Sequence, residues 1–140
     1  MDANQAHGPS VSWEGTFAPE ATAVRRSRIG VSGALQEAGV SPQVITDALL
    51  VLAELVGNAV RHAGTDLTVA VTVQEGVLRI EVFDYDTRTP ALVGLDDEST
   101  SGRGLHIVAG IARDWGWQTA ESDDGVSGKR VWAEMAADSP

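Results

Sequence analysis

Two alternating segments joined by a two-residue turn constrain the fold of this chain most strongly. Apolar and polar residues alternate over Leu67–Gln74 and again over residues 77–83, which is the period of half-buried β-strands. Glu75 and Gly76 stand between the two segments, and a connection of two residues joins antiparallel strands as a β-hairpin. The chain is therefore predicted to contain an antiparallel sheet.

The remaining elements surround this hairpin in a regular order. Alternation predicts three further strands, over residues 11–17, 115–121 and 129–135. Apolar residues at helical spacing predict three helices, over residues 19–38, 42–62 and 104–114. Each helix carries one apolar stripe, so we expect all three on one face of the sheet. The predicted fold is an α/β two-layer sandwich with a mixed, mostly antiparallel sheet.

Helix boundaries have local signals. Gly30 and Gly33 lower the helix propensity of the first helix and could interrupt it. Ser41 and Pro42 are suited to the N-cap and the first position of the second helix. Gly64 is suited to its end.

Composition limits the classes of function. The chain has 140 residues and a net charge of −10, which argues against a nucleic-acid or anionic-membrane surface. There is no cysteine, so disulfides and thiolate chemistry are excluded. No apolar run approaches 18 residues. We expect a soluble, cytoplasmic protein with one domain over residues 11–135, a disordered tail at 1–10 and a free tail at 136–140.

The second helix concentrates polar chemistry on one side. At about 100° per residue, Glu54, Asn58, Arg61 and His62 fall within one arc of roughly 100°. A carboxylate can accept a proton, an amide oxygen can ligate Mg²⁺, and a guanidinium can pair with phosphate. The alternative is a surface helix with a mixed polar face. The opposite side is apolar and comprises Ile45, Leu49, Leu52, Val56, Ala59 and Ala63.

Asp84 follows the second hairpin strand. A carboxylate at a strand end beside a pocket can accept a hydrogen bond from an exocyclic amine, which adenine has where guanine presents an oxygen. The alternative is that Asp84 only begins a turn.

Two further segments could contact a ligand. A long loop at residues 85–102, of a length typical of functional lids, leads through two glycines into the third predicted helix, where a helix N-terminus can bind phosphate. On the last strand, either Lys129 or Arg130 could close a pocket, although exposed basic residues on a strand are common.

These segments together resemble a known family. Residues 54–62 resemble the N-box of the GHKL, or histidine-kinase-like, ATPases. Asp84 resembles the adenine-contacting aspartate of their G1 box, and residues 102–105 resemble the G2 box of their lid. The order and spacing are most similar to the anti-sigma-factor serine kinases of bacterial partner switches, as are residues 112–116 and 128–135.

The resemblance implies a Bergerat fold that binds ATP with Mg²⁺. It implies that Glu54 is the general base, that Asn58 ligates Mg²⁺ and that Asp84 binds the adenine amine. Gly102 and Gly104 would let lid amides surround the phosphates. The residues implied to bind the cofactor are Asn58, Arg61, His62, Asp84, Gly102, Arg103, Gly104, Leu105 and Lys129.

The implied function is that of an anti-sigma factor that is also a serine/threonine-protein kinase. Its partners would be a sigma factor and a STAS-type anti-sigma antagonist that it phosphorylates, with no direct nucleic-acid or membrane contact. A homodimer is compatible with the resemblance. The alternative is a catalytically weak or inactive module that acts by partner capture alone. Asp86 favours this alternative as a second carboxylate near the nucleotide, and so does Arg130, where many members have threonine. A third, weaker reading is a detached catalytic domain that serves the histidine of another protein.

Overall fold

The hairpin predicted at Glu75 and Gly76 is present in the computed structural model, which describes residues 10–88 and 103–137. Strands β2 (Leu67–Gln74) and β3 (Val77–Asp84) pair antiparallel over their whole length. The two turn residues have φ values of 53° and 79°. Positive φ at both central residues is the geometry of a type I′ turn, whose twist matches that of the flanking strands.

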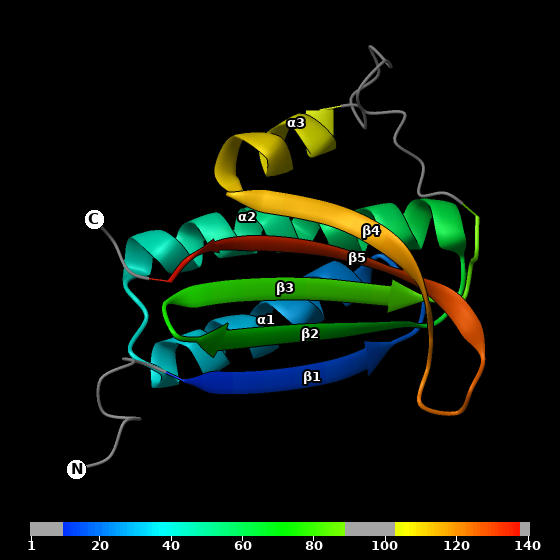
Figure 1. The fold of residues 1–140 in the computed structure, drawn as a ribbon, viewed down its shortest axis with the longest axis horizontal. Helices are drawn as coiled ribbons and strands as arrows, with labels where there is room; N and C mark the ends of the chain where they lie inside the picture. The colour runs from blue at the N-terminus through cyan, green and yellow to red at the C-terminus, as the bar shows by residue number, and fades with distance from the viewer. Residues whose placement is uncertain (1–9, 89–102, 138–140) are drawn as a thin grey trace.

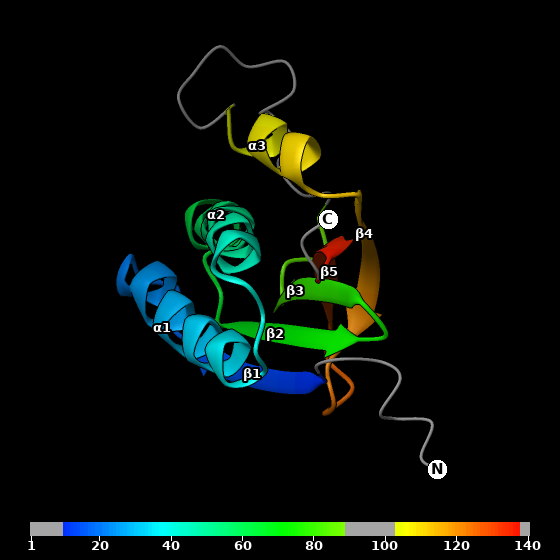
Figure 2. The ribbon, with the colours of Figure 1, turned by 90° about the vertical axis from the view of Figure 1, so that its left-hand side faces the viewer.

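The other strands extend this hairpin into a five-stranded sheet of order β1-β2-β3-β5-β4. All four neighbouring pairs are antiparallel, so no parallel pair is found among the described strands. All three helices lie on one face, as predicted (Figures 1 and 2). The last strand extends one residue beyond its predicted end. The remaining strands are β1 (Val11–Phe17), β4 (Asp114–Glu121) and β5 (Ser127–Ala136).

Helix α1 (Thr22–Glu37) runs through both of its central glycines without a break. Gly30 faces strand β1, and a Cβ placed there would lie 2.2 Å from the Trp13 ring. Gly33 has nothing within 4 Å of the same position. The first glycine is therefore explained by packing, because the indole of Trp13 occupies the space of its missing side chain.

Helix α2 (Pro42–Asn58) is the central helix of the covering layer. The Ser41 hydroxyl accepts a hydrogen bond from the Val44 N–H at 3.4 Å, as expected of an N-cap. The helix continues as one π-helical turn, Ala59–Ala63, which ends at Gly64 with a φ of 66°. Turns of this kind are frequent at functional sites.

The buried surface of α2 is wider than one stripe. Four of the predicted apolar positions are buried, and Leu49 and Ala63 are half-buried. Positions outside that stripe are buried as well, namely Val44, Ala48, Val51 and Leu55. The helix packs between α1 and α3 as well as against the sheet, which accounts for the additional burial (Figure 2).

The same helix is the one described segment long and apolar enough to meet the criteria for a membrane span. Together with its π-helical turn it covers 22 residues at a mean hydropathy of 1.5, and half of the tested window is buried inside the fold. Core helices meet these criteria as well, so its apolar composition is explained by packing.

Helix α3 (Arg103–Ile111) ends three residues before its predicted limit, and Asp114 already belongs to β4. The predicted lid at residues 85–102 lies mostly outside the described residues, as does the predicted tail at residues 1–10.

Candidate functional site

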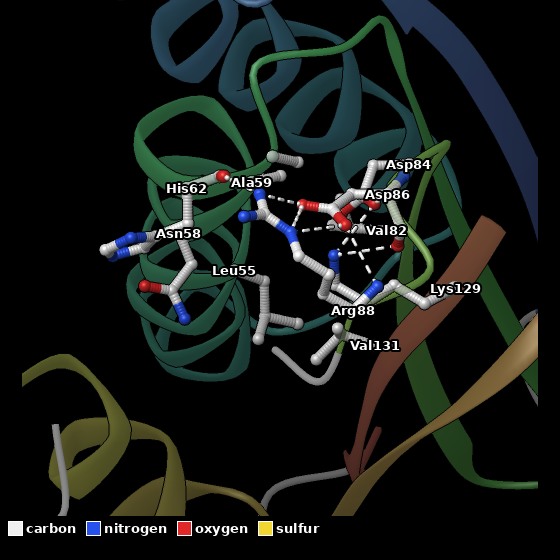
Figure 3. Close-up of a pocket in the computed structure, with 11 residues that line it drawn as sticks. Leu55, Asn58, Ala59, His62, Val82, Asp84, Asp86, Arg88, Lys129 and Val131 are labelled. Carbon is white, nitrogen blue, oxygen red and sulfur yellow. Dashed lines mark hydrogen bonds and ion pairs between the residues drawn. The ribbon is translucent and has the colours of Figure 1, made fainter. Parts of the chain in front are cut away.

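A cavity of about 190 Å³ lies between the C-terminal end of α2 and the neighbouring ends of β3 and β5 (Figure 3). One wall is apolar, and four charged side chains line the cavity beside it. The strand ends are adjacent because Asp84 of β3 pairs in register with Lys129 of β5. The cavity is lined by Leu55, Asn58, Ala59, His62, Ala63, Val82, Asp84, Asp86, Arg88, Lys129 and Val131.

Asp84 and Lys129 form a buried ion pair at this cavity. The Lys129 ammonium donates to Asp84 Oδ1 at 2.9 Å and to the backbone oxygen of Asp86 at 3.1 Å. The side chains of Asp84 and Lys129 are 2% and 7% exposed. Oδ1 also accepts the Asp86 N–H at 2.9 Å, whereas Oδ2 accepts no hydrogen bond from any described residue. A carboxylate oxygen therefore remains available to a ligand.

The negative charge of Asp86 is compensated by Arg88, a residue that the sequence analysis did not single out. The guanidinium donates to both carboxylate oxygens, with Nε–Oδ1 at 2.9 Å and Nε–Oδ2 at 3.0 Å. These bonds and the Arg88 N–H hold the pKa of Asp86 well below its usual range. Arg88 also donates to the backbone oxygen of His62 at 3.2 Å, so it connects the end of β3 to the end of the helix.

The polar residues of the second helix separate into two groups. Asn58 and His62 line the cavity, although both side chains extend away from the Asp84–Lys129 pair (Figure 3). Glu54 and Arg61 do not line it. Arg61 instead lies over the helix surface and donates to Asn58 Oδ1 at 3.4 Å.

The imidazole of His62 is in an electropositive environment. Partial burial lowers its pKa, and the positive charges of Arg61 and Lys129 lower it further. A neutral imidazole can accept a hydrogen bond, and it becomes a donor at both nitrogens once it is protonated.

The alternative between Lys129 and Arg130 is decided by strand register. Lys129 pairs with Asp84 on the helix-covered face, while Arg130 pairs with Phe83 and points from the open face of the sheet. There Arg130 makes an ion pair with Glu81 at 2.8 Å. Lys129 therefore lines the cavity and Arg130 does not, because neighbouring residues of a strand point to opposite faces.

The predicted phosphate-binding segment is described only in part. Gly102 lies outside the described residues. Arg103, Gly104 and Leu105 form the beginning of α3. No group of three or more His, Cys, Asp or Glu side chains suited to a metal ion occurs in the described part of the chain.

Sequence reasoning missed the apolar wall formed by Leu55, Val82 and Val131 and the pairing of Arg88. The helical spacing of Leu55 relative to Asn58 and His62 is a signal for the wall, because residues three and four apart share a helix face. The short separation of Asp86 and Arg88 is a signal for the ion pair.

A family model described as "Histidine kinase-like ATPase domain" matches residues 17–134. The fold is similar to the crystal structure of the RsbU and RsbW domains of Rv1364c from Mycobacterium tuberculosis, with a TM-score of 0.60 and 18% identity. That match covers 91% of this chain and 34% of the other, so the chain spans about a third of that protein chain.

A second similar structure is a chain of the SiaB–SiaC complex from Pseudomonas aeruginosa. Its TM-score is 0.61 at 12% identity, and the match covers 95% of this chain and 93% of that one. At these identities the two solved structures indicate a shared fold. No curated protein matches the sequence.

Proposed function

The chain belongs to the family of histidine kinase-like ATPase domains, and from this membership we propose that it binds ATP as a partner-switching regulator. In this proposal it is a cytoplasmic anti-sigma factor that sequesters a sigma factor and phosphorylates a serine or threonine of a STAS-type antagonist. The domain would cover residues 11–135. The two similar structures support this proposal, since one contains RsbU and RsbW domains and the other is a chain of the SiaB–SiaC complex.

The observation that carries the proposal is the position of Asp84. Its carboxylate is buried at one end of a cavity that has one apolar wall, and only Oδ1 is engaged by described residues. Oδ2 accepts from no described residue, so it can accept a hydrogen bond from an amine donor on a ligand. Adenine offers such an amine and a flat apolar surface for that wall.

We assign the rest of the cofactor to residues at and beside the cavity. Asn58 carries an amide oxygen of the kind that Mg²⁺ accepts, and Arg61 stands beside it. ATP with Mg²⁺ would supply the transferable phosphoryl group when bound. Of the chain's own residues, Glu54 would accept the proton of the attacking hydroxyl, and the N-terminus of α3 would face the phosphates together with Gly102 and Gly104.

In the sequence, Asp86 and Arg130 favour loss of nucleotide binding, but the structure gives each of them another explanation. The charge of Asp86 is compensated by Arg88, so a second free carboxylate does not face the phosphates. Arg130 lies on the other face of the sheet and pairs with Glu81. Both findings support retained ATP binding.

Partner capture without catalysis is the second candidate function, and the outer surface of α1 favours it. An open apolar groove of about 670 Å³ runs along α1, where Ile29 is 66% exposed. Arg25 and Arg28 border the groove and make no ion pair with described residues, in a chain of net charge −10. A partner helix with apolar residues and acidic flanks fits this groove.

Substitution of Glu54 tests the kinase function. Glu54→Gln keeps the shape of the side chain and removes its ability to accept a proton. A positioned general base contributes about 10²–10⁴-fold in rate, so we expect ATP affinity within a few-fold of wild type and loss of most phosphoryl transfer. Transfer is measured with radiolabelled ATP against STAS-type antagonists captured from the native cell, with Glu37→Gln on α1 as the matched control.

Transfer by Glu54→Gln at the wild-type rate would contradict the role of Glu54. If the wild type binds ATP and a sigma factor but phosphorylates no captured antagonist, partner capture is the better description. Substitution of Ile29 by Glu should then abolish sigma-factor binding while ATP binding is unchanged.

A further inference from the structure

Lys129 is an unusual neighbour for a carboxylate that is proposed to recognise adenine. Its ammonium is almost completely buried and uses two of its three N–H donors, one on Asp84 Oδ1 and one on the Asp86 backbone oxygen. No other described residue accepts from it. Burying an ammonium is costly unless its hydrogen bonds are satisfied, so the third donor is available to a partner in the cavity.

The free donor stands beside the free acceptor. Lys129 Nζ lies 2.9 Å from Asp84 Oδ1, so Nζ and the unengaged Oδ2 present a donor and an acceptor next to each other at one end of the cavity. Adenine has the complementary pattern, because its exocyclic amine is a donor and the adjacent ring nitrogen is an acceptor. Guanine presents an oxygen at the position of that amine, and this oxygen would face the carboxylate.

We propose that Lys129 donates a hydrogen bond to the ring nitrogen next to the adenine amine and so acts with Asp84 as a specificity-determining residue. This inference rests on the proposed ATP binding. It assigns two polar contacts to the base, one at the amine and one at the ring nitrogen. The competing role for Lys129 is purely structural, in which it only compensates the charge of Asp84.

The two roles differ in their response to a change in the ligand. We would titrate the wild-type protein by calorimetry with ATP, 1-deaza-ATP and 7-deaza-ATP, each with Mg²⁺. The two analogues remove one or the other ring nitrogen beside the amine and leave the protein intact. Hydrogen bonds to charged groups are strong enough that we expect about a tenfold or greater loss of affinity for one of the two analogues.

A variant connects this loss to Lys129. Lys129→Met should bind ATP as weakly as the wild type binds the analogue that lacks the contacted ring nitrogen. The affinity of that analogue should be the same for the variant and the wild type. Arg130→Met is the matched control, since it removes a cation from the next residue on the opposite face and should keep the wild-type pattern. If Lys129→Met does not fold, the wild-type titrations still test whether a ring nitrogen is contacted, and equal affinities would still overturn the proposal.

Three outcomes would overturn the inference. Equal affinity of the wild type for ATP and both analogues excludes a contact to a ring nitrogen. The same analogue penalty in Lys129→Met as in wild type assigns the contact to another residue. If the wild type binds no ATP, the proposed function fails and this inference fails with it, whereas the first two results leave ATP binding in place.

Discussion

At the scale of single residues, the site depends on a buried charge pair rather than on an isolated carboxylate. Asp84 and Lys129 come from different strands, and each satisfies a group that would be costly to bury alone. The pair also fixes which oxygen of Asp84 is available to a ligand. Stability and ligand recognition are therefore linked at this position.

Removing one partner of the pair should destabilise the protein strongly. Lys129→Met leaves the Asp84 carboxylate buried without its cation, and such changes cost about 3–5 kcal/mol. The free energy of unfolding in urea measures the cost. Asp84→Leu combined with Lys129→Met removes both charges and should recover most of the loss. A single substitution that costs less than about 1 kcal/mol would mean that the pair is not buried in solution.

The Asp86–Arg88 pair should stabilise the fold in a pH-dependent way. The folded-state pKa of Asp86 lies below its unfolded value of 3.8, chiefly because of the hydrogen bond from Arg88. Its contribution is therefore present above pH 3.8 and is lost as the pH falls below that value. We expect Arg88→Met to lower the melting temperature at pH 7, with a difference from wild type that shrinks progressively below pH 4. A difference of constant size between pH 7 and pH 2.5 would contradict this assignment.

At the scale of elements, α1 and β1 approach closely where the Trp13 ring lies against Gly30. A glycine in a helix costs about 1 kcal/mol relative to alanine. In α1 the Trp13 ring explains the glycine at position 30, whereas no contact explains Gly33. The two glycines of this helix form an internal comparison.

Alanine should have opposite effects at the two glycines of α1. Gly33→Ala enters open space and should stabilise the protein by up to about 1 kcal/mol. Gly30→Ala would place a methyl group 2.2 Å from the Trp13 ring, and overpacking of this kind costs about 1–3 kcal/mol. Urea unfolding of both variants gives the comparison. Equal shifts in stability would mean that Trp13 does not pack against α1 as described.

At the scale of the whole molecule, the sequence predicted the architecture better than the site. Strand alternation and the Glu75–Gly76 turn specified the hairpin almost to the residue, because both signals are local. The partner of Lys129 on the neighbouring strand could not be predicted, since it depends on the register between β3 and β5. The extra burial of α2 was missed for a related reason, because it depends on packing against α1, α3 and the sheet, which are distant in the sequence.

The helix motif illustrates the same limit at the site. Periodicity placed Glu54, Asn58, Arg61 and His62 on one side of α2, and only Asn58 and His62 line the cavity. The helix axis and its neighbours decide which part of a polar face meets a pocket. The roles of Glu54 and Arg61 remain predictions to be tested by substitution.

The central claim is that this chain binds ATP through Asp84, and a calorimetric titration tests it most directly. Wild-type protein would be titrated with ATP and with GTP in Mg²⁺, alongside Asp84→Asn and the control Asp114→Asn at the distant start of β4. The account predicts that wild type and Asp114→Asn bind ATP, that neither binds GTP comparably, and that Asp84→Asn loses ATP affinity by at least about tenfold. Equal binding of ATP and GTP, or unchanged ATP affinity in a folded Asp84→Asn variant, would contradict it.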